Sequence, residues 1–342
     1  MFALADLDVP IVGAPLAGGP ATVELAAAVC EAGGLGSIAG AVRTPEQIEA
    51  DVAALRERTT RPFAVNVFEA QRRAGDPDEV ARYAKALAAE GRPLGEARHD
   101  DDRLREKLAL LVELRPAVVS FTFGCPARPT IDRLRAAGCA VWVTVTTPEE
   151  AVFAAGMGAD ALVVQGVEAG GHRGGFDDDA PGDYGLLALL QLVDAAVEVP
   201  LVAAGGIMTG RGVAAVLAAG ASAAQLGSAL MRTPEAGTSA PHREALAAGD
   251  RPTGLTRAFS GRLARGIVNR FQREHADAPS AYPEVHHLTT PMRAAARAEG
   301  DAESINLWAG QAYPLAREAP AAQIVRDLAA EAQARLRELA GG

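Results

Sequence analysis

The feature that most constrains this 342-residue chain is the regular alternation of short, β-branched apolar runs with alanine-rich stretches at helical spacing. The apolar runs predict eight strands. They span Val9–Ala14, Gly34–Ile38, Pro62–Val67, Ala117–Phe121, Ala140–Val145, Ala159–Val164, Pro200–Ala204 and Ala223–Leu226. Eight strands, each followed by a helix, within about 230 residues are typical of an α/β parallel barrel, the (β/α)8 TIM barrel, whose sites lie at the carboxyl ends of the strands.

The predicted helices have start signals of their own. Thr44-Pro45-Glu46-Gln47 and Thr147-Pro148-Glu149-Glu150 each combine a cap residue, a proline at the first helical position and an acid or amide in the first turn. The helices are expected over residues 21–31, 44–58, 78–89, 104–114, 130–137, 147–155, 184–196 and 210–219. An open doubly wound sheet is the alternative, and its dinucleotide-binding version is weakened because no GxGxxG turn follows the first strand.

Two segments stand outside the strand-helix alternation. Residues 68–102, after the third strand, are charged and interrupted by glycine and proline, with one expected helix at Asp78–Ala89, so we interpret them as an insertion that acts as a lid. Residues 1–236 would form the barrel, and 237–342 a mostly helical C-terminal extension that closes over its mouth, with one apolar segment at Arg257–Gly261. The amphipathic stretch Ala321–Leu339 is expected to pack on the scaffold.

Composition narrows the classes of partner. The formal charge is −10, the pI is near 5.2, and lysines and arginines are scattered, which argues against nucleic acid or an anionic membrane and favours small molecules. The amino terminus lacks the pattern of a signal peptide, and the apolar stretch 185–207 is broken by Asp194, Glu198 and Pro200, so neither export nor a membrane anchor is expected.

The cysteines agree with a cytoplasmic location. Cys30, Cys125 and Cys139 are odd in number and lack the spacing of metal ligands, which fits a reducing compartment. Cys125, beside Pro126, is either a nucleophile or a small apolar filler near the barrel rim. The second interpretation is favoured because no histidine stands near it in sequence.

The richest loop follows the sixth predicted strand. Gln165 to Gly175 contains five glycines and His172, so the backbone could approach a ligand closely while one titratable ring stays beside it. The alternative is a flexible loop with a solvated histidine. Ala204-Gly205-Gly206-Ile207 and Gln225-Leu226-Gly227-Ser228 end the seventh and eighth strands, where barrels of this kind commonly bind a phosphate through backbone N–H groups, although ordinary tight turns would look similar.

Other polar residues have more open roles. Arg173 or Arg211 could balance the charge of a phosphate. Asn66 and Gln165 are neutral amides at strand ends, able to donate to and accept from the edge of a flavin ring or to satisfy a turn. His286 and His287 are weaker candidates than His172, and we expect His99, His242 and His275 to be exposed; no His and carboxylate cluster has the spacing of a metal site.

Five segments carry a family resemblance. They are Pro10–Gly19, Val164–Gly174, Ala203–Ile207, Gln225–Ser228 and Asn306–Gln311, and they resemble the nitronate monooxygenase family, formerly called 2-nitropropane dioxygenases, in order over almost the whole chain. The resemblance implies a barrel that binds FMN noncovalently, with His172 as the active-site base. It implies FMN contacts from Leu16, Asn66, Gln165, Gly170, Gly171, Gly205, Gly206, Gln225, Leu226, Gly227 and Ser228. Two positions depart from the family pattern: Leu16 stands where methionine is common and Ser228 where threonine is frequent.

The implied reaction converts an alkyl nitronate and dioxygen into a carbonyl compound and nitrite. In it His172 would either remove the proton alpha to a neutral nitro group or, when protonated, hold an anionic nitronate. Related flavin enzymes, an NAD(P)H:quinone reductase or an enoyl thioester reductase, are the alternative function, and a noncatalytic flavin carrier or sensor is a third. The sequence leaves open the physiological substrate, the use of NAD(P)H and the oligomeric state, a homo-oligomer included.

Overall fold

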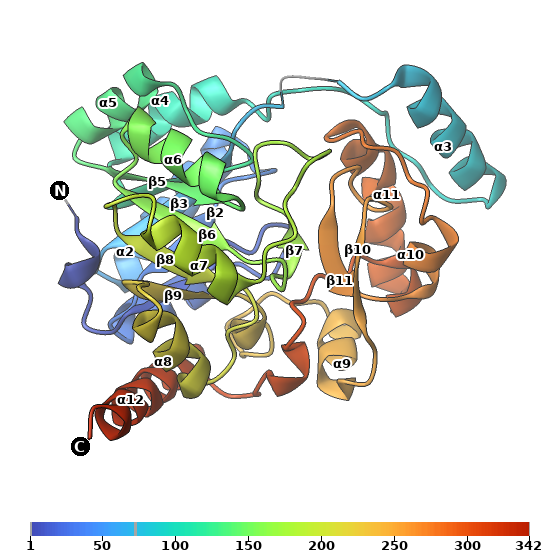
Figure 1. Cartoon of the computed structure of the whole chain (residues 1–342). Helices are drawn as coiled ribbons and strands as arrows, with labels where there is room; N and C mark the ends of the chain where they lie inside the picture. Colours follow the sequence, from blue (N-terminus) through green and yellow to red (C-terminus); the bar gives the residue numbers. More distant parts are fainter. Residues whose placement is uncertain (1, 72–73, 342) are drawn as a thin grey trace.

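The computed structural model describes residues 2–71 and 74–341, and its centre is a sheet of eight parallel strands (Figure 1). Their spatial order is β1-β9-β8-β6-β5-β4-β3-β2, and an isolated parallel bridge between Val12 and Leu35 joins the two ends into a barrel. The strands are β1 Ile11–Gly13, β2 Gly36–Ala39, β3 Phe63–Phe68, β4 Val118–Thr122, β5 Ala140–Val145, β6 Ala161–Gln165, β8 Leu201–Ala204 and β9 Ala223–Leu226. The (β/α)8 prediction is confirmed, and both ends of every predicted strand lie within two residues of their expected positions.

Helices surround the barrel close to the predicted positions. They are α1 Val23–Glu31, α2 Pro45–Arg58, α4 Leu104–Leu114, α5 Arg128–Ala136, α6 Pro148–Met157, α7 Leu186–Asp194 and α8 Gly210–Ala218. The side chain of Thr44 accepts from the backbone N–H of Gln47 while the Gln47 side chain accepts from Thr44 N, the reciprocal capping box. Thr147 caps α6 through Glu150 N at 3.2 Å. Local chemistry therefore decides where α2 and α6 begin.

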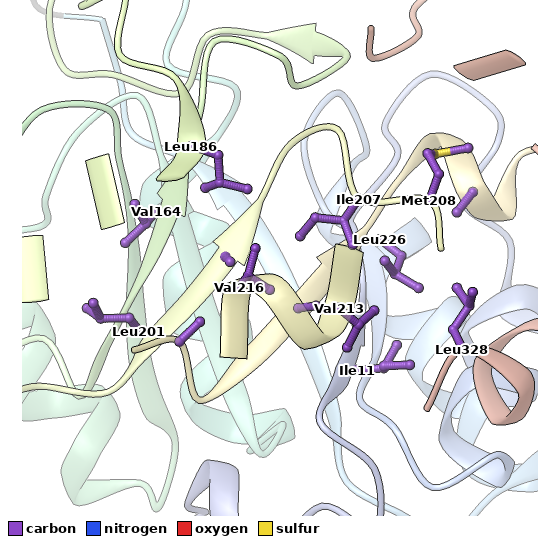
Figure 2. Close-up of a cluster of buried hydrophobic side chains, with 14 of the residues drawn as sticks. Ile11, Val164, Leu186, Leu201, Ile207, Met208, Val213, Val216, Leu226 and Leu328 are labelled. Carbon is purple, nitrogen blue, oxygen red and sulfur yellow. The ribbon is translucent and has the colours of Figure 1, made fainter. Parts of the chain in front are cut away.

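The core lies in two layers around the strands. Inward-facing residues such as Val118, Trp142 and Val202 fill the barrel, and outward-facing residues pack against the helices. Figure 2 shows the outer layer, in which Leu226 of β9 and Val213 of α8 lie near Leu328. Leu328 belongs to α12 (Ala321–Leu339), the last helix of the chain, which packs against α8. The expectation for this amphipathic helix is confirmed.

One glycine allows α8 and α12 to pack closely. A Cβ on Gly210 would lie 2.1 Å from the Cβ of Glu331, and the Glu331 carboxylate accepts a hydrogen bond from Gly210 N at 3.1 Å. Because any side chain at Gly210 would push the helices apart, the contact depends on glycine.

The extension contains a small sheet that the sequence analysis missed. Strands β10 Thr253–Thr256 and β11 Ala264–Ile267 are antiparallel, and β11 also pairs with β7, the two residues Gly171–His172 in the loop after β6. The segment Arg257–Gly261, expected as an apolar segment between helices, forms the turn between β10 and β11. Local patterns could not show β11 because one of its partners lies about 90 residues earlier.

The rest of the extension is helical, with α9 Ala240–Ala248, α10 Arg270–Glu274 and α11 Glu284–Glu299. Four short 3-10 turns, at Leu4–Asp6, Ser228–Leu230, Ala302–Ser304 and Tyr313–Leu315, complete the described elements. The helix in the 68–102 segment, α3 (Pro77–Ala89), lies beside α11 (Figure 1), and its Tyr83 donates to the carbonyl of Ala258 at 2.7 Å. The domain division at residue 236 and the lid role of residues 68–102 stay predictions.

None of the helices in the described part of the chain has the combined length and apolar character needed to cross a membrane.

Candidate active site

A cavity of about 330 Å³ opens at the carboxyl ends of the barrel strands. The loops after β1, β6, β8 and β9 line one side of it, and residues of the extension line the other. His172 and ten of the eleven residues expected to contact a cofactor lie in its wall: Leu16, Asn66, Gln165, Gly170, Gly171, Gly205, Gly206, Gln225, Gly227 and Ser228. Leu226 does not, because its side chain is fully buried in the outer core layer (Figure 2).

Glycine lets the backbone itself form part of this wall. Gly171, Gly205 and Gly206 have φ values of 76°, 122° and 68°, a region that side-chain-bearing residues rarely adopt. A Cβ on Gly171 would meet nothing within 4 Å, so this position borders open space. Neither arginine considered as a counter-charge lines the cavity. Arg173 is fully buried and donates to the carbonyl of Gly166 at 2.7 Å, and Arg211 is exposed on α8.

The side-chain amides of Asn66 and Gln165 differ in which of their atoms are left for a ligand. Asn66 is 2% exposed and its Nδ2 donates to Ser120 and Thr122 at 3.0–3.1 Å, while no hydrogen bond from the described residues reaches its Oδ1. Gln165 Oε1 accepts from Gly174 N at 2.9 Å, and its Nε2 donates to the carbonyl of His172 at 3.1 Å. Asn66 therefore has an acceptor available to a ligand. Gln165 mainly fixes the loop that carries His172 and keeps one amide hydrogen for a ligand.

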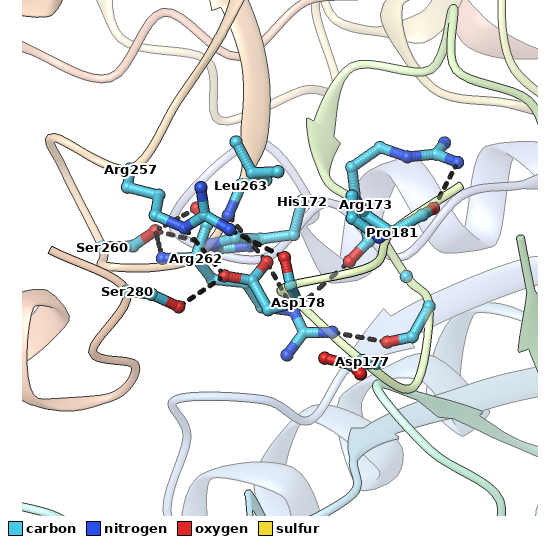
Figure 3. Close-up of polar contacts among 12 residues, drawn as sticks. His172, Arg173, Asp177, Asp178, Pro181, Arg257, Ser260, Arg262, Leu263 and Ser280 are labelled. Carbon is cyan, nitrogen blue, oxygen red and sulfur yellow. Dashed lines mark hydrogen bonds and ion pairs between the residues drawn. The ribbon is translucent and has the colours of Figure 1, made fainter. Parts of the chain in front are cut away.

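His172 is held between the barrel and the extension. Its backbone pairs with Ala264 of β11, and its Nε2 lies 2.9 Å from Ser260 Oγ (Figure 3). Four aromatic rings surround the imidazole, those of Phe123, Tyr282, Trp308 and Phe68, with centroid distances of 5.5, 5.7, 5.8 and 6.3 Å. The ring reaches the cavity but is otherwise enclosed, and this desolvation, with Arg262 and Arg293 nearby, lowers the pKa of His172 to about 3. The imidazole is therefore neutral at ordinary pH.

Ser260 decides which nitrogen of that imidazole is free. Its hydroxyl lies 3.2 Å from the carbonyl of Arg262, to which it can donate its single hydrogen. The oxygen then accepts from His172 Nε2, which places the proton on Nε2 and leaves Nδ1 with a lone pair. Sequence reasoning missed Ser260, and its only signal was a polar residue within the apolar segment 257–261.

A carboxylate ties the His172 loop to the extension. Asp178 Oδ2 accepts from Arg257 Nε at 3.0 Å and from Ser280 Oγ at 3.2 Å, and its Oδ1 accepts from Leu263 N at 3.0 Å (Figure 3). Arg262, next to Leu263, donates to the carbonyls of Arg173 and Gly175, and its guanidinium lies 3.9 Å from the ring centre of Phe123. The position of Ser260 and His172 thus depends on contacts from both segments.

The other histidines differ from expectation in two cases. His242 and His275 were expected to be exposed, but each is 6% exposed. His242 lines the cavity, with its Nε2 3.1 Å from the carbonyl of Trp308, and burial lowers its pKa to about 4. His275 lies against Glu90 at 3.2 Å, while His99 is exposed as expected. The Trp308 segment covers His242, and Tyr83 and Glu90, from the segment after β3, cover His275, so a local polar pattern could not reveal either burial.

The adjacent histidines His286 and His287, both candidates from the sequence, point in different directions. His286 lines the cavity, whereas His287 faces Asp100 at 3.0 Å.

Cys125 is half-buried against two core layers, and burial with the charge of Glu69 raises the pKa of its thiol to about 12. Such a thiol is a poor nucleophile at neutral pH, which favours the filler interpretation.

The fold and the site together define a class: a (β/α)8-barrel enzyme with its cavity at the carboxyl ends of the strands and a neutral histidine inside it. A profile of the nitronate monooxygenase family matches residues 3–331. The chain belongs to the nitronate monooxygenase family, and it is accordingly an oxidoreductase.

Individual relatives agree with this assignment. A nitronate monooxygenase of Pseudomonas aeruginosa strain PAO1 is 43% identical, over 96% of this chain and 97% of that protein. The solved structure of a nitroalkane oxidase from Streptomyces ansochromogenes is 50% identical, with a TM-score of 0.94 over 98% of this chain and 99% of that chain. FabK from Thermotoga maritima is more distant, at 27% identity and a TM-score of 0.75 over 99% and 97% of the two chains.

Proposed function

We propose that this protein oxidises alkyl nitronates with dioxygen to carbonyl compounds and nitrite, using FMN. The observation that carries the proposal is the meeting of His172 with the glycine loops after β6, β8 and β9 in one cavity. Relatives named nitronate monooxygenase and nitroalkane oxidase, at 43% and 50% identity, support the substrate class.

The barrel side of the cavity fits a phosphorylated flavin. Gly205 and Gly206 have positive φ and border the cavity next to Gly227 and Ser228, so backbone rather than side chains would meet a phosphate. Asn66 Oδ1 can accept from a flavin ring N–H. FMN, when bound, would supply the electron transfer between substrate and dioxygen, which no side chain in this cavity can perform.

His172 would act at the substrate carbon that bears the nitrogen, where a proton is removed. Desolvation keeps the imidazole neutral, so Nδ1 has a lone pair that can accept a proton from a neutral nitroalkane, while the same low pKa makes the ring a weaker base than a free histidine. When the substrate is already a nitronate, its negative charge would raise the pKa of His172. The protonated imidazole would then hold the anion. Phe123, Tyr282 and Trp308 would exclude water around this step.

The test is an oxygen-consumption assay over a panel of nitronates with nitrite measured alongside. We expect yellow protein that contains FMN, and one nitrite formed for each nitronate consumed. Colourless protein that does not bind added FMN, or oxygen uptake without nitrite from every nitronate, would contradict the proposal.

A flavin-dependent reductase, the alternative raised from the sequence, stays the second candidate function. An anaerobic experiment separates the two: NADH or NADPH is mixed with the purified protein and the flavin absorbance is followed. A nitronate monooxygenase should keep its yellow colour, whereas a reductase that takes hydride from a nicotinamide would bleach within its turnover time.

A further inference from the structure

Two arginines of α11 face the cavity from the extension side. Arg293 and Arg297 are four residues apart, so they occupy the same face of the helix, and both line the cavity that contains His172. Arg293 is 6% exposed and Arg297 is half-buried. Two cations side by side in a mostly enclosed space repel each other, and each loses hydration there.

Only neutral groups contact these arginines within the described residues. Arg293 Nε donates to Thr289 Oγ1 at 3.1 Å, and its Nη2 donates to the carbonyl of His286 at 3.0 Å and to Thr290 Oγ1 at 2.9 Å. Arg297 Nη2 donates to Asn306 Oδ1 at 3.0 Å. Within residues 2–71 and 74–341, neither guanidinium pairs with a carboxylate, and the Nη1 of each has no hydrogen-bond acceptor.

Two other arginines near the site face a carboxylate. Arg257 and Arg262 lie at 3.0 and 4.0 Å from the Asp178 carboxylate. Desolvation lowers the pKa of the buried Arg173 guanidinium, and the nearby charges of Glu150 and Glu168 raise it against that effect.

Desolvation and the charge of Arg297 lower the pKa of Arg293 to about 9, whereas no carboxylate of the described chain raises it. Arginine with free in-plane donors is suited to planar oxyanions, which can accept two parallel hydrogen bonds. An uncompensated pair of this kind is costly for the fold, so a ligand that supplies the missing negative charge would explain it.

We propose that Arg293 and Arg297 form a subsite for a small planar oxyanion, a carboxylate or nitrite, at the extension side of the cavity and separate from the barrel loops expected to hold FMN. Two sources could provide that chemistry, and both rest on the proposed function. The anion is either the nitrite released in the reaction or a carboxylate carried by the organic substrate away from its reacting carbon.

The first experiment measures binding without turnover. The thermal unfolding midpoint of the purified flavin-containing protein is followed in sodium formate and in sodium nitrite, against sodium chloride at equal ionic strength. We expect formate and nitrite to raise the midpoint above that in chloride, with a concentration dependence that gives the dissociation constant. Equal midpoints in all three salts would overturn the subsite.

Variants assign the effect to these residues. Arg293→Met should weaken formate and nitrite binding by at least about tenfold, while its midpoint in chloride is unchanged or higher because a buried uncompensated charge is gone. Arg297→Gln serves as the second variant if Arg293→Met folds poorly. Arg82→Gln, at an exposed arginine of α3 outside the cavity, is the matched control and should keep the full effect.

Two results with the variants would overturn the proposal. One is an undiminished formate and nitrite effect in both Arg293→Met and Arg297→Gln. The other is loss of FMN from these variants at intact stability, since the arginines would then serve the cofactor.

Kinetic experiments identify the source of the anion. If nitrite occupies the subsite, it should inhibit the wild-type enzyme competitively against the nitronate, and Arg293→Met should relieve that inhibition. If a substrate carboxylate occupies it, Arg293→Met should lower kcat/KM for a carboxylated nitronate relative to an uncharged one of equal length. Absence of turnover would contradict the proposed function yet leave the thermal experiment able to judge the subsite.

Discussion

The two sides of the cavity are built in different ways. The barrel side is neutral and includes glycine backbone and the amides of Asn66, two residues before the end of β3, and Gln165, the last residue of β6. The extension side supplies Ser260, aromatic rings and the two α11 arginines, and it comes from segments far apart in the chain. We therefore propose that cofactor binding and handling of the reacting group fall to separate segments, so substitutions can test one without removing the other.

Replacement of His172, which lies between the two sides, should have the largest effect. We expect His172→Asn to lower the rate of nitrite formation by about 10²- to 10⁴-fold, the usual contribution of a general base. Flavin content should persist because, within the described residues, the only hydrogen bond of the His172 side chain goes to Ser260, not to the barrel loops. Nitrite release and flavin absorbance of the same samples measure both effects.

The control for this substitution is His99→Asn, at an exposed histidine outside the cavity. It should keep both turnover and flavin. Unchanged turnover in His172→Asn would remove the residue from catalysis, and loss of flavin would show that the two sides are not separable at this position.

The division of the cavity into a barrel side and an extension side also explains which site residues could be predicted from the sequence. The barrel strands and the turns at Gly205, Gly206 and Gln225 follow from local periodicity and from the rule that strand ends meet at one rim, so the amino-acid pattern alone is enough to locate them. Asn66 follows from the same rule. These residues need only their own strand to reach the cavity.

The extension side could not be predicted because its contacts join distant segments. Ser260 reaches His172 across 88 residues, and Asp178 reaches Leu263 across 85. The pairing of β7 with β11 rests on two residues of a glycine-rich loop, too few to show an alternating pattern. The buried state of His242 likewise arises from the Trp308 segment, 66 residues later.

Acid sensitivity tests the buried histidines of the cavity. The folded-state pKa of His242, about 4, lies below the unfolded value near 6.5, so the unfolded chain binds the proton more readily. The contribution of His242 to the free energy of unfolding is therefore fully present above about pH 6.5. It is lost as the pH falls toward 4, by about 1.4 kcal/mol per pH unit.

We expect His242→Gln, which can still donate to the Trp308 carbonyl, to reduce this loss by on the order of 3 kcal/mol at the acid end. Denaturant unfolding at a series of pH values measures the slope. Identical slopes in the variant and the parent would mean that His242 titrates in the folded state as it does when unfolded.

The Asp178 connection should matter next. Asp178→Asn removes the charge that faces Arg257 and Arg262, and we expect a loss of about 2 kcal/mol in unfolding free energy together with slower turnover. Asp177→Asn is the matched control because Asp177 is exposed and its carboxylate accepts only from Asp179 N among the described residues. Equal stability of the two variants, measured by denaturant unfolding, would show that the loop does not depend on this carboxylate.

The smallest effect is expected from the hydroxyl that orients His172. Ser260→Ala removes a neutral hydrogen bond of about 1 kcal/mol, so kcat should fall about fivefold as the imidazole loses its fixed tautomer. KM and flavin content should stay constant, because Ser260 meets the ring of His172 rather than the barrel loops. Ser260→Cys, of similar shape but a weaker hydrogen-bonding group, should give an intermediate kcat. If instead KM rises while kcat is unchanged, Ser260 contacts the substrate directly, and the extension side would orient the substrate rather than the base.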